Sequence, residues 1–340
     1  MKIFLTGATG FLGANVLRLL LAEGHAVVCP IRAPNRCVEG LPATLVRLPL
    51  AEGPAEEAAL ADAMRGCDGL MHVAGLFDPS PGGEARMAAV HVGATRALLR
   101  AAEAAGVRRF LYCSSSVTVG FGSKAQPGDE DTHLDADVVY GRANPLRAYH
   151  DSKAAGEALV LGAAGVEGLV VNPDYIIGPW DTKPTSGQLI LAMGKGWVPV
   201  YPRGGKCFQG AEDCARGHLL ALERGVAGRR YLLGSHNLSY REFMGMVAEV
   251  VGRPAPFLPL PRRATAALGW AGARLQRIDA HRFAGLDGRV LGAMQQDRYR
   301  SGRRAEQELG LVSRPLQESV EAAWRWFRAQ GMAGPRPKTG

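Results

Sequence analysis

The sequence predicts an α/β fold, in which a doubly wound parallel sheet is followed by a smaller C-terminal lobe. Short apolar segments alternate with longer helical patterns through the first half of the chain, as in sheets built from strand–helix–strand units. A glycine-rich turn joins the first apolar segment to the first helical pattern. The 340 residues are enough to bury the core of this sheet and of a second lobe. We expect the first unit at residues 1–172, with later segments returning to it, the second lobe at 173–330 and a disordered tail at 331–340.

The individual elements follow from local patterns. A strand is expected where an apolar run of strand length is bounded by turn residues. A helix is expected where strong helix formers such as Ala and Leu recur over a longer stretch, and glycines such as Gly106 end these stretches. The strands predicted in this way are residues 3–5, 26–29, 45–48, 69–74 and 109–116, and the helices are residues 14–21, 55–64 and 87–105.

The turn after the first strand carries glycines at three-residue spacing, Gly7, Gly10 and Gly13. Glycines between a strand and a helix allow a tight turn and a close approach of the backbone to a pyrophosphate at the helix N-terminus. The position of the turn, more than its spacing, therefore predicts a Rossmann-type dinucleotide-binding unit.

The loop after the second strand indicates which dinucleotide is bound. An acidic residue there would bind the ribose 2′-hydroxyl of NAD(H). This chain has no acid in the loop and has Arg32 and Arg36 instead. Because a guanidinium suits a 2′-phosphate, the sequence favours NADP(H), with NAD(H) as the alternative.

Tyr149 and Lys153 lie four residues apart in a strongly helix-forming stretch. That spacing places both side chains on one face of a helix. A cation beside a phenol stabilises the phenolate and lowers the phenol pKa from its usual value of about 10. Such a pair can protonate a carbonyl or deprotonate an alcohol while a hydride moves. The alternative is a tyrosine and a lysine on a solvated helix.

Charge and cysteine content restrict the partners and the location. Residues 251–340 hold 16 Lys and Arg against 7 Asp and Glu, although the whole chain carries a net charge of only +8. This basic part, with residues 262–277 in particular, suggests a peripheral contact with the inner membrane face, although a solvated basic surface explains it as well. The six cysteines show no disulfide framework or metal-binding spacing, which favours a cytoplasmic protein without a metal. No nucleic-acid-binding motif is present, and a homodimer is left open.

Several motifs occur in the order that is typical of one superfamily. The chain resembles the extended short-chain dehydrogenases/reductases of the NAD-dependent epimerase/dehydratase superfamily. Within it, the chain is most similar to the group of dihydroflavonol-4-reductase-like proteins, hopanoid-associated epimerases and 3β-hydroxysteroid dehydrogenases. The motifs that carry the resemblance are residues 6–13, His72-Val73-Ala74, residues 113–119, Tyr149 with Lys153, residues 171–173, 178–185 and 212–215, and residues 304–311.

The resemblance implies a role for each matching residue. Tyr149 would be the general acid/base, Lys153 would lower its pKa and hold the nicotinamide ribose, and Ser116 would orient the substrate oxygen. The usual adenine-contacting acid after the third strand is replaced in the run that ends at Leu50. The usual asparagine before the fifth strand is His91. The residues implied for cofactor binding are Gly7, Gly10, Phe11, Leu12, Gly13, Arg32, Arg36, Leu50, Ala74, Tyr149, Lys153 and Pro173.

The expected substrate residues are bulky and apolar. Tyr175 stands where enzymes that act on sugar nucleotides carry a diphosphate-binding asparagine, and Ile176 follows it. Phe77, Trp180 and Trp197 complete the predicted set, although aromatic residues are as often part of a core. If these side chains line a cleft, its ligand is apolar.

These expectations combine into an NADP(H)-dependent oxidoreductase that acts on a carbonyl or secondary alcohol of a hydrophobic ring compound. Candidates are a sterol, a hopanoid or other isoprenoid, or a flavonol-like molecule, with 3-hydroxysteroid dehydrogenation and decarboxylation or 3-ketosteroid reduction among the reactions. One alternative is a nucleotide-sugar epimerase or dehydratase, for which Lys206 keeps a cation near the expected phosphate position. A second alternative is a non-catalytic dinucleotide-binding regulator, which the set of Ser116, Tyr149 and Lys153 argues against.

Overall fold

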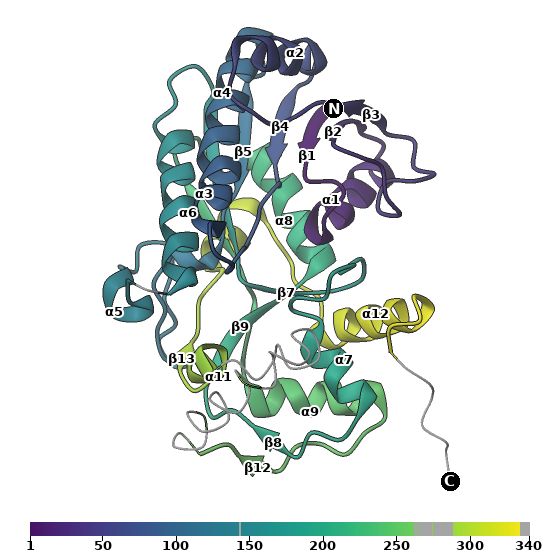
Figure 1. Ribbon diagram of the computed structural model, residues 1–340, viewed down its shortest axis with the longest axis vertical. Coiled ribbons are helices and arrows are strands. Elements are labelled where there is room, and N and C mark those ends of the chain that lie inside the picture. Colours follow the sequence, from purple (N-terminus) through teal and green to yellow (C-terminus); the bar gives the residue numbers. More distant parts are fainter. Residues whose placement is uncertain (143, 262–264, 266–273, 275–287, 334–340) are drawn as a thin grey trace.

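A seven-stranded parallel sheet forms the centre of the N-terminal unit (Figure 1). The protein is described by a computed structural model at residues 1–142, 144–261, 265, 274 and 288–333. The strands lie in the order β10-β6-β5-β4-β1-β2-β3, so the predicted doubly wound parallel sheet is confirmed. They are β1 (Lys2–Thr6), β2 (Ala26–Ile31), β3 (Thr44–Arg47), β4 (Gly69–His72), β5 (Arg109–Cys113), β6 (Glu167–Pro173) and β10 (Arg230–Leu233).

Helices cover both faces of this sheet (Figure 1). Side chains alternate along a strand, so Ile3 and Leu5 pack into the core under α1 and α8, whereas Phe4 packs into the core under α2 and α4. The helices of this unit are α1 (Phe11–Ala22), α2 (Pro54–Met64), α3 (Gly83–Ala88), α4 (Ala94–Ala105), α5 (Ala136–Tyr140), α6 (Pro145–Leu161) and α8 (Ala211–Arg224).

The strand order reverses between β1 and β4, which are neighbours in the sheet. In open α/β sheets the crevice at the carboxyl ends of such strands binds ligands. The Thr6 hydroxyl ties the two ends together, since it hydrogen-bonds His72 Nδ1 at 2.7 Å and accepts a hydrogen bond from the Ala74 N–H at 3.1 Å. The crevice is therefore bordered by a fixed pair of strand ends.

The smaller lobe lies below the sheet in Figure 1. Its core contains Phe208 and Phe243, whose rings stack with 4.2 Å between centroids. Its strands are β7 (Tyr175–Ile177), β9 (Gly205–Gly210), β11 (His236–Ser239) and β13 (Asp297–Arg298) in one sheet, and β8 (Val200–Tyr201) with β12 (Leu258–Pro259) in another. Its helices are α7 (Gln188–Lys195), α9 (Tyr240–Val251), α11 (Gly288–Ala293) and α12 (Leu316–Ala329). The π-helical turn η4 (Ala305–Leu309) returns to the N-terminal unit, where Ala305 and Leu309 pack into the core under α1 and α8.

Two local predictions differ from the structure. The helix expected at residues 87–105 is interrupted by a π-helical turn, η1 (Ala89–Gly93), which carries His91. The strand expected at 109–116 ends at Cys113, and a short 3₁₀ turn, η2 (Ser116–Thr118), follows. Most of the basic segment 262–277 and of the predicted tail 331–340 lies outside the described residues. Within the described part, no helix is long and apolar enough to cross a bilayer.

Candidate active site

The glycine turn has the shape that a pyrophosphate requires. Gly7 has a φ of +78°, and a Cβ there would lie 2.6 Å from the Ala74 nitrogen. A Cβ at Gly13 would lie 2.0 Å from the Gly7 carbonyl oxygen, so both positions require glycine. Gly10 caps α1 without a side-chain hydrogen bond, which leaves the N–H groups of Phe11 and Leu12 in the first turn to bind an anion. The turn therefore fits a dinucleotide, at the crevice between β1 and β4.

The two arginines after β2 have different surroundings. Arg36 donates a hydrogen bond to Gln330 Oε1 at 2.6 Å, at the end of α12. Arg32 is exposed directly after the strand. The Asn35 amide donates to the Thr9 carbonyl at 3.0 Å, so this loop is fixed to the glycine turn. Arg36 is thus engaged with the end of α12, whereas Arg32 is exposed in a loop that is fixed to the glycine turn.

Helix α6 brings Tyr149 and Lys153 to the carboxyl end of β5. Asn144 caps the helix and Pro145 is its first residue, which defines where the helix begins. Lys153 is only 2% exposed, and its Nζ donates to the Cys113 carbonyl at 2.9 Å. Burial lowers the pKa of Lys153 to about 8. The lysine is therefore held at the strand end with a proton that is more labile than usual.

The Tyr149 ring lies between two other rings. Phe77 packs edge-on against it with 5.4 Å between centroids, and His91 does so at 5.5 Å. Burial raises the pKa of Tyr149 to about 12. The net shift of this pKa is upward because burial disfavours the charged phenolate, and a lowering of the pKa by Lys153 stays a prediction.

Of the three serines after β5, Ser115 is the one that acts on the phenol, and the substrate contact expected of Ser116 stays a prediction. The Ser115 side chain forms a hydrogen bond with Tyr149 that opposes the rise in the pKa of the phenol. Ser116 is buried as the first residue of η2. β5 ends at Cys113, directly before the three serines. Which of Ser114, Ser115 and Ser116 faces the phenol therefore depends on the path of the backbone after the strand.

His91 is a site residue whose role the sequence did not reveal. Its Nε2 accepts a hydrogen bond from the Leu76 N–H at 3.0 Å, and its Nδ1 lies 2.9 Å from Ser152 Oγ. Ser152 Oγ in turn donates to the Tyr149 carbonyl at 3.0 Å. These contacts define the neutral tautomer with the proton on Nδ1, and burial lowers the pKa of His91 to about 2. His91 therefore fixes the catalytic helix to the loop after β4.

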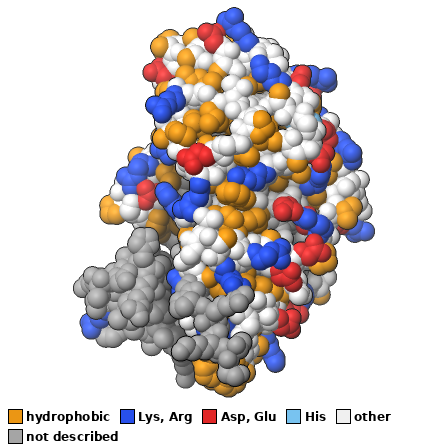
Figure 2. Space-filling view, turned by 90° about the vertical axis from the view of Figure 1, so that its right-hand side faces the viewer, with side chains coloured by type: hydrophobic (Ala, Val, Ile, Leu, Met, Phe, Trp, Pro, Cys, Tyr) orange, Lys and Arg blue, Asp and Glu red, His pale blue; other side chains and the backbone are white. Residues whose placement is uncertain are grey.

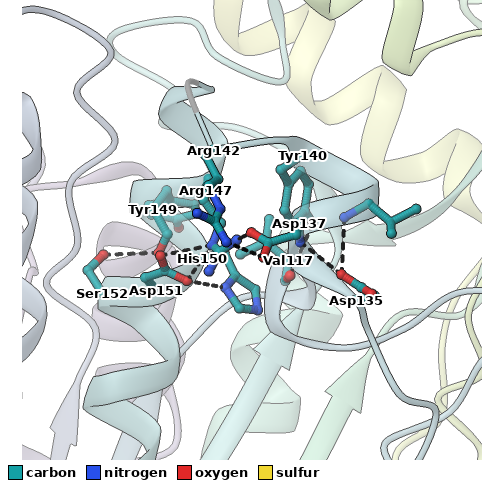
Figure 3. A network of polar contacts seen from close by, with 11 residues as sticks. Val117, Asp135, Asp137, Tyr140, Arg142, Arg147, Tyr149, His150, Asp151 and Ser152 are labelled. Atoms are coloured by element: carbon teal, nitrogen blue, oxygen red, sulfur yellow. Dashed lines mark hydrogen bonds and ion pairs between the residues drawn. The ribbon is translucent and has the colours of Figure 1, made fainter.

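Ion pairs on the outer side of α6 support the same helix (Figure 3). Arg147 pairs with Asp151 one turn along, at 2.8 Å, and also with Asp137 of α5. The Tyr140 hydroxyl, at the end of α5, donates to the Val117 carbonyl at 3.0 Å. The turn of α6 that carries Tyr149 is thus tied to both α5 and η2.

A buried network lies below Ser115. The Asn172 amide donates to the Ser115 carbonyl at 3.2 Å, to Thr118 Oγ1 at 3.0 Å and to Glu157 Oε1 at 2.7 Å. Glu157 also lies 3.5 Å from Arg230. The network joins β6 and α6 around η2, so the position of Ser115 is set by residues far away in the sequence.

The predicted substrate residues do not form one group. Phe77 is brought to Tyr149, as described above, and Tyr175 and Ile176 lie on β7, which follows β6. The Tyr175 hydroxyl donates to the Ser186 carbonyl at 3.2 Å. Trp197 is 54% exposed and stacks on Phe257, beside β8 and β12 at the far end of the lobe. Trp197 is therefore not brought to the catalytic residues.

Trp180 connects the two lobes instead of standing alone in a cleft. It has a φ of 73°, a conformation that a bulky residue rarely adopts. The Arg18 guanidinium lies 3.3 Å above its ring, and Trp326 packs beside it at 5.9 Å. The Asn15 amide also donates to the Pro179 carbonyl at 2.9 Å. Trp180 thus fastens the start of the second lobe to α1.

Three cations gather where β6 leads into the second lobe. Arg300 forms an ion pair with the buried Asp174 at 2.7 Å, and Lys206 lies 3.8 Å from the same carboxylate. The Arg298 guanidinium lies 5.2 Å from the Phe121 ring. Burial lowers the pKa of Lys206 and of Arg298. Within this cluster, the carboxylate of Asp174 lies among three cations, namely Lys206, Arg298 and Arg300.

The remaining predicted cofactor residues lie near the same crevice or in the core. Ala74 touches the Gly7 turn, Pro173 ends β6, and Leu50 packs against the core under α2 and α4. Within the described residues, no group of three or more His, Cys, Asp or Glu side chains could hold a metal ion.

A glycine turn that fits a dinucleotide lies at the crevice between β1 and β4, and α6 brings the half-buried Tyr149 and the buried Lys153 to the end of β5. This arrangement defines a dinucleotide-dependent enzyme. A family model described as "NAD dependent epimerase/dehydratase family" matches residues 3–234. The chain belongs to this family, and the resemblance inferred from its motifs is confirmed.

Comparisons with individual proteins agree with this family. The chain is 33% identical to the "Putative dihydroflavonol 4-reductase" of Synechocystis sp., over 96% of this chain and 95% of the relative. It is 29% identical to sterol demethylase protein B of Methylococcus capsulatus, over 98% of this chain and 100% of the relative. A solved structure of a nucleoside-diphosphate-sugar epimerase from Pseudomonas aeruginosa is 28% identical, with a TM-score of 0.73, and the match covers 98% of this chain and 99% of that one.

Proposed function

We propose that this protein is an NADP(H)-dependent oxidoreductase that acts on a carbonyl or secondary alcohol of a hydrophobic ring compound. The observation that carries the proposal is the Tyr149 phenol, which is bonded to Ser115 and lies between Phe77 and His91. Such a phenol can exchange a proton with a substrate oxygen.

The chain's own residues supply proton transfer and positioning. A bound nicotinamide dinucleotide supplies the hydride exchange. Because burial raises the pKa of Tyr149 to about 12, the phenol keeps its proton at neutral pH, which supports its use as an acid in carbonyl reduction. The Ser115 hydroxyl would hold the same substrate oxygen. Lys153 would contact the nicotinamide ribose from the end of β5.

The NADP(H) preference rests on Arg32. It is an exposed guanidinium after β2, in a loop without an acidic residue between Pro30 and Cys37. A 2′-phosphate offers such a group a charge-assisted hydrogen bond, whereas a 2′-hydroxyl offers a weaker one.

The apolar substrate class is supported by the surroundings of the phenol and by two relatives. Phe77, 48% exposed, presents an aromatic ring beside Tyr149. Tyr175 uses its hydroxyl on the Ser186 carbonyl, so this hydroxyl is not left to donate to a diphosphate. The two relatives are named after a dihydroflavonol and a sterol, both hydrophobic ring compounds.

A nucleotide-sugar epimerase or dehydratase is the second candidate, and one observation favours it. The cluster of Lys206, Arg298 and Arg300 around Asp174 has an excess of positive charge near the end of β6. Such an excess suits a diphosphate, and the family includes proteins that act on sugar nucleotides, as the Pseudomonas structure is named.

Turnover of paired substrates distinguishes the two candidates. The purified enzyme is mixed with NADPH and a sterol ketone or a dihydroflavonol, and loss of NADPH is followed by absorbance. A parallel reaction with NAD⁺ and UDP-galactose is followed by sugar analysis. We expect NADPH consumption with a ring ketone and no epimerised sugar. Epimerisation without consumption of NADPH would contradict the proposal in favour of the second candidate.

A further inference from the structure

An apolar tip lies at the end of the smaller lobe that is farthest from the seven-stranded sheet. We define the aromatic tip as residues 195–203 and 253–261, which include the paired strands β8 and β12. Both strands lie at the lower end of the molecule in Figure 1. Figure 2, turned about the vertical axis, shows hydrophobic side chains at that lower end.

The tip exposes three large apolar side chains. Trp197 is 54% exposed, Phe257 58% and Leu258 47%. The rings of Trp197 and Phe257 stack on each other, with 5.9 Å between centroids and 20° between their planes. Large apolar groups that pack together outside the core mark surfaces that are covered by another molecule or phase.

The tip is a defined structure that its own backbone holds in place. The N–H groups of Phe257 and Leu258 both donate to the Pro199 carbonyl at 3.0 Å. The Leu260 N–H donates to the Tyr201 carbonyl at 2.8 Å. Prolines, each of which fixes one backbone dihedral angle, further restrict the two segments. They are Pro199, Pro202, Pro254, Pro256, Pro259 and Pro261. The apolar groups are therefore held at the surface before any partner binds.

The rim of the tip is positively charged. The two segments contain Lys195, Arg203 and Arg253, and neither segment contains Asp or Glu. Lys195 and Arg203 are exposed. Tryptophan favours the interface between water and lipid, and cations near it are attracted to anionic headgroups.

We infer that the aromatic tip is a docking surface for an anionic lipid bilayer, with Trp197 and Phe257 at the level of the headgroups. A second copy of the chain fits the tip less well. A symmetric contact would set the three cations against the same three cations. Three apolar side chains also cover far less than the ~1,000 Å² that a stable interface requires. This inference concerns a surface remote from Tyr149 and is independent of the proposed substrate.

Vesicle flotation with the full chain tests the inference. The wild type is mixed with vesicles of phosphatidylcholine and phosphatidylglycerol in equal parts, and with vesicles of phosphatidylcholine alone. We expect binding to the mixed vesicles that weakens with added salt, and weaker binding to the neutral ones. In the variant Trp197→Ser/Phe257→Ser the partition coefficient should fall at least tenfold. The matched control is Val138→Ser/Val312→Ser, which removes two apolar side chains that are 81% and 82% exposed elsewhere, and it should bind as the wild type does.

Charge reversal gives a second measurement. Lys195→Glu/Arg203→Glu should abolish the preference for phosphatidylglycerol while leaving thermal unfolding unchanged. Unchanged vesicle binding in Trp197→Ser/Phe257→Ser, or no binding by the wild type, would overturn the inference. A wild-type dimer that this variant converts to a monomer would overturn it in favour of contact between copies. All variants should turn over a water-soluble ketone at the same rate. This measurement tests the proposed function separately from vesicle binding.

Discussion

The imidazole of His91 stands edge-on to the phenol ring of Tyr149, with 5.5 Å between their centroids. Through Ser152, the same imidazole is also linked to the Tyr149 backbone. His91 thus restrains both the ring and the main chain of the candidate acid, while its other nitrogen accepts a hydrogen bond from Leu76. A side chain that makes these three contacts can do so only as a neutral imidazole, and this has a consequence for the dependence of stability on pH.

Stability should fall as the solution becomes acidic. Burial lowers the pKa of His91 to about 2 and that of His72 to about 3, whereas histidines in the unfolded chain titrate near pH ~6.5. Below that pH the unfolded state binds protons that the folded state does not, so the free energy of unfolding decreases. Each histidine should contribute about 1.4 kcal/mol per pH unit between pH ~6 and ~4.

Urea unfolding across this range measures the slope, and His91→Asn should make it shallower by about 1.4 kcal/mol per pH unit. The control is His133→Asn, because His133 is exposed and should leave the slope as it is. A slope that is identical in the wild type and in His91→Asn would contradict the buried, neutral His91.

Tyr149→Phe should remove most of the turnover while the dinucleotide still binds. The phenylalanine keeps the ring between Phe77 and His91 but has no proton to transfer, and general acid catalysis contributes roughly 10²- to 10⁴-fold. Stopped-flow measurement of kcat and fluorescence titration with NADPH separate the two effects. Tyr201→Phe, which removes a hydroxyl in β8, is the control. A near-normal kcat in Tyr149→Phe would rule out the proposed acid.

Ser115→Ala and Ser116→Ala should differ. The Ser115 side chain acts on the Tyr149 phenol, so its loss should reduce kcat/KM about tenfold or more, as expected for a hydrogen bond of about 1.5 kcal/mol. Ser116→Ala should keep most of the activity. Steady-state kinetics of the two variants decide the question, and the opposite order would support the role that the family resemblance implied for Ser116.

The two arginines after β2 should differ in their effect on cofactor choice. Arg32→Asp should weaken NADPH binding roughly ten- to a hundred-fold, because a charge-assisted hydrogen bond to phosphate is worth about 1.5–3 kcal/mol. Arg36→Asp should have the smaller effect, since Arg36 is bonded to Gln330. Calorimetric titration with NADPH and NADH measures both. Equal affinity of the wild type for the two cofactors would remove the basis for the NADP(H) preference.

The ion pair between Asp174 and Arg300 should be the most sensitive charged contact of the fold. Both side chains are almost fully buried, so Arg300→Met leaves the Asp174 carboxylate in the interior with only the longer contact to Lys206 at 3.8 Å, at a cost of up to about 5 kcal/mol. The matched control is Arg229→Met, which breaks a half-exposed pair with Glu308 and should cost less than about 1 kcal/mol. Chemical unfolding of both variants tests this, and similar losses would show that burial of the pair is not decisive.

Local sequence patterns determined the parallel sheet, the glycine turn and the common face of Tyr149 and Lys153. These features depend on neighbours within a few residues, because apolar runs, glycine spacing and helix periodicity act over one turn or one strand. The absence of Asp and Glu from the loop after β2 is also a property of a few neighbouring residues. The expectations that rest on such patterns could therefore be made from the amino-acid order alone.

Tertiary structure decided the rest, because burial and register depend on segments that are distant in the chain. Three adjacent serines look equivalent in the sequence, yet only the path of the chain after β5 turns Ser115 toward the phenol. The spacing of Tyr149 and Lys153 predicted a cation beside the phenol, whereas the net upward shift of the phenol pKa comes from burial. Arg300 reaches Asp174 across 126 residues, and nothing local marks either residue as a partner. Sequence patterns specify which chemistry is present, whereas packing decides which groups meet and how water is excluded from them.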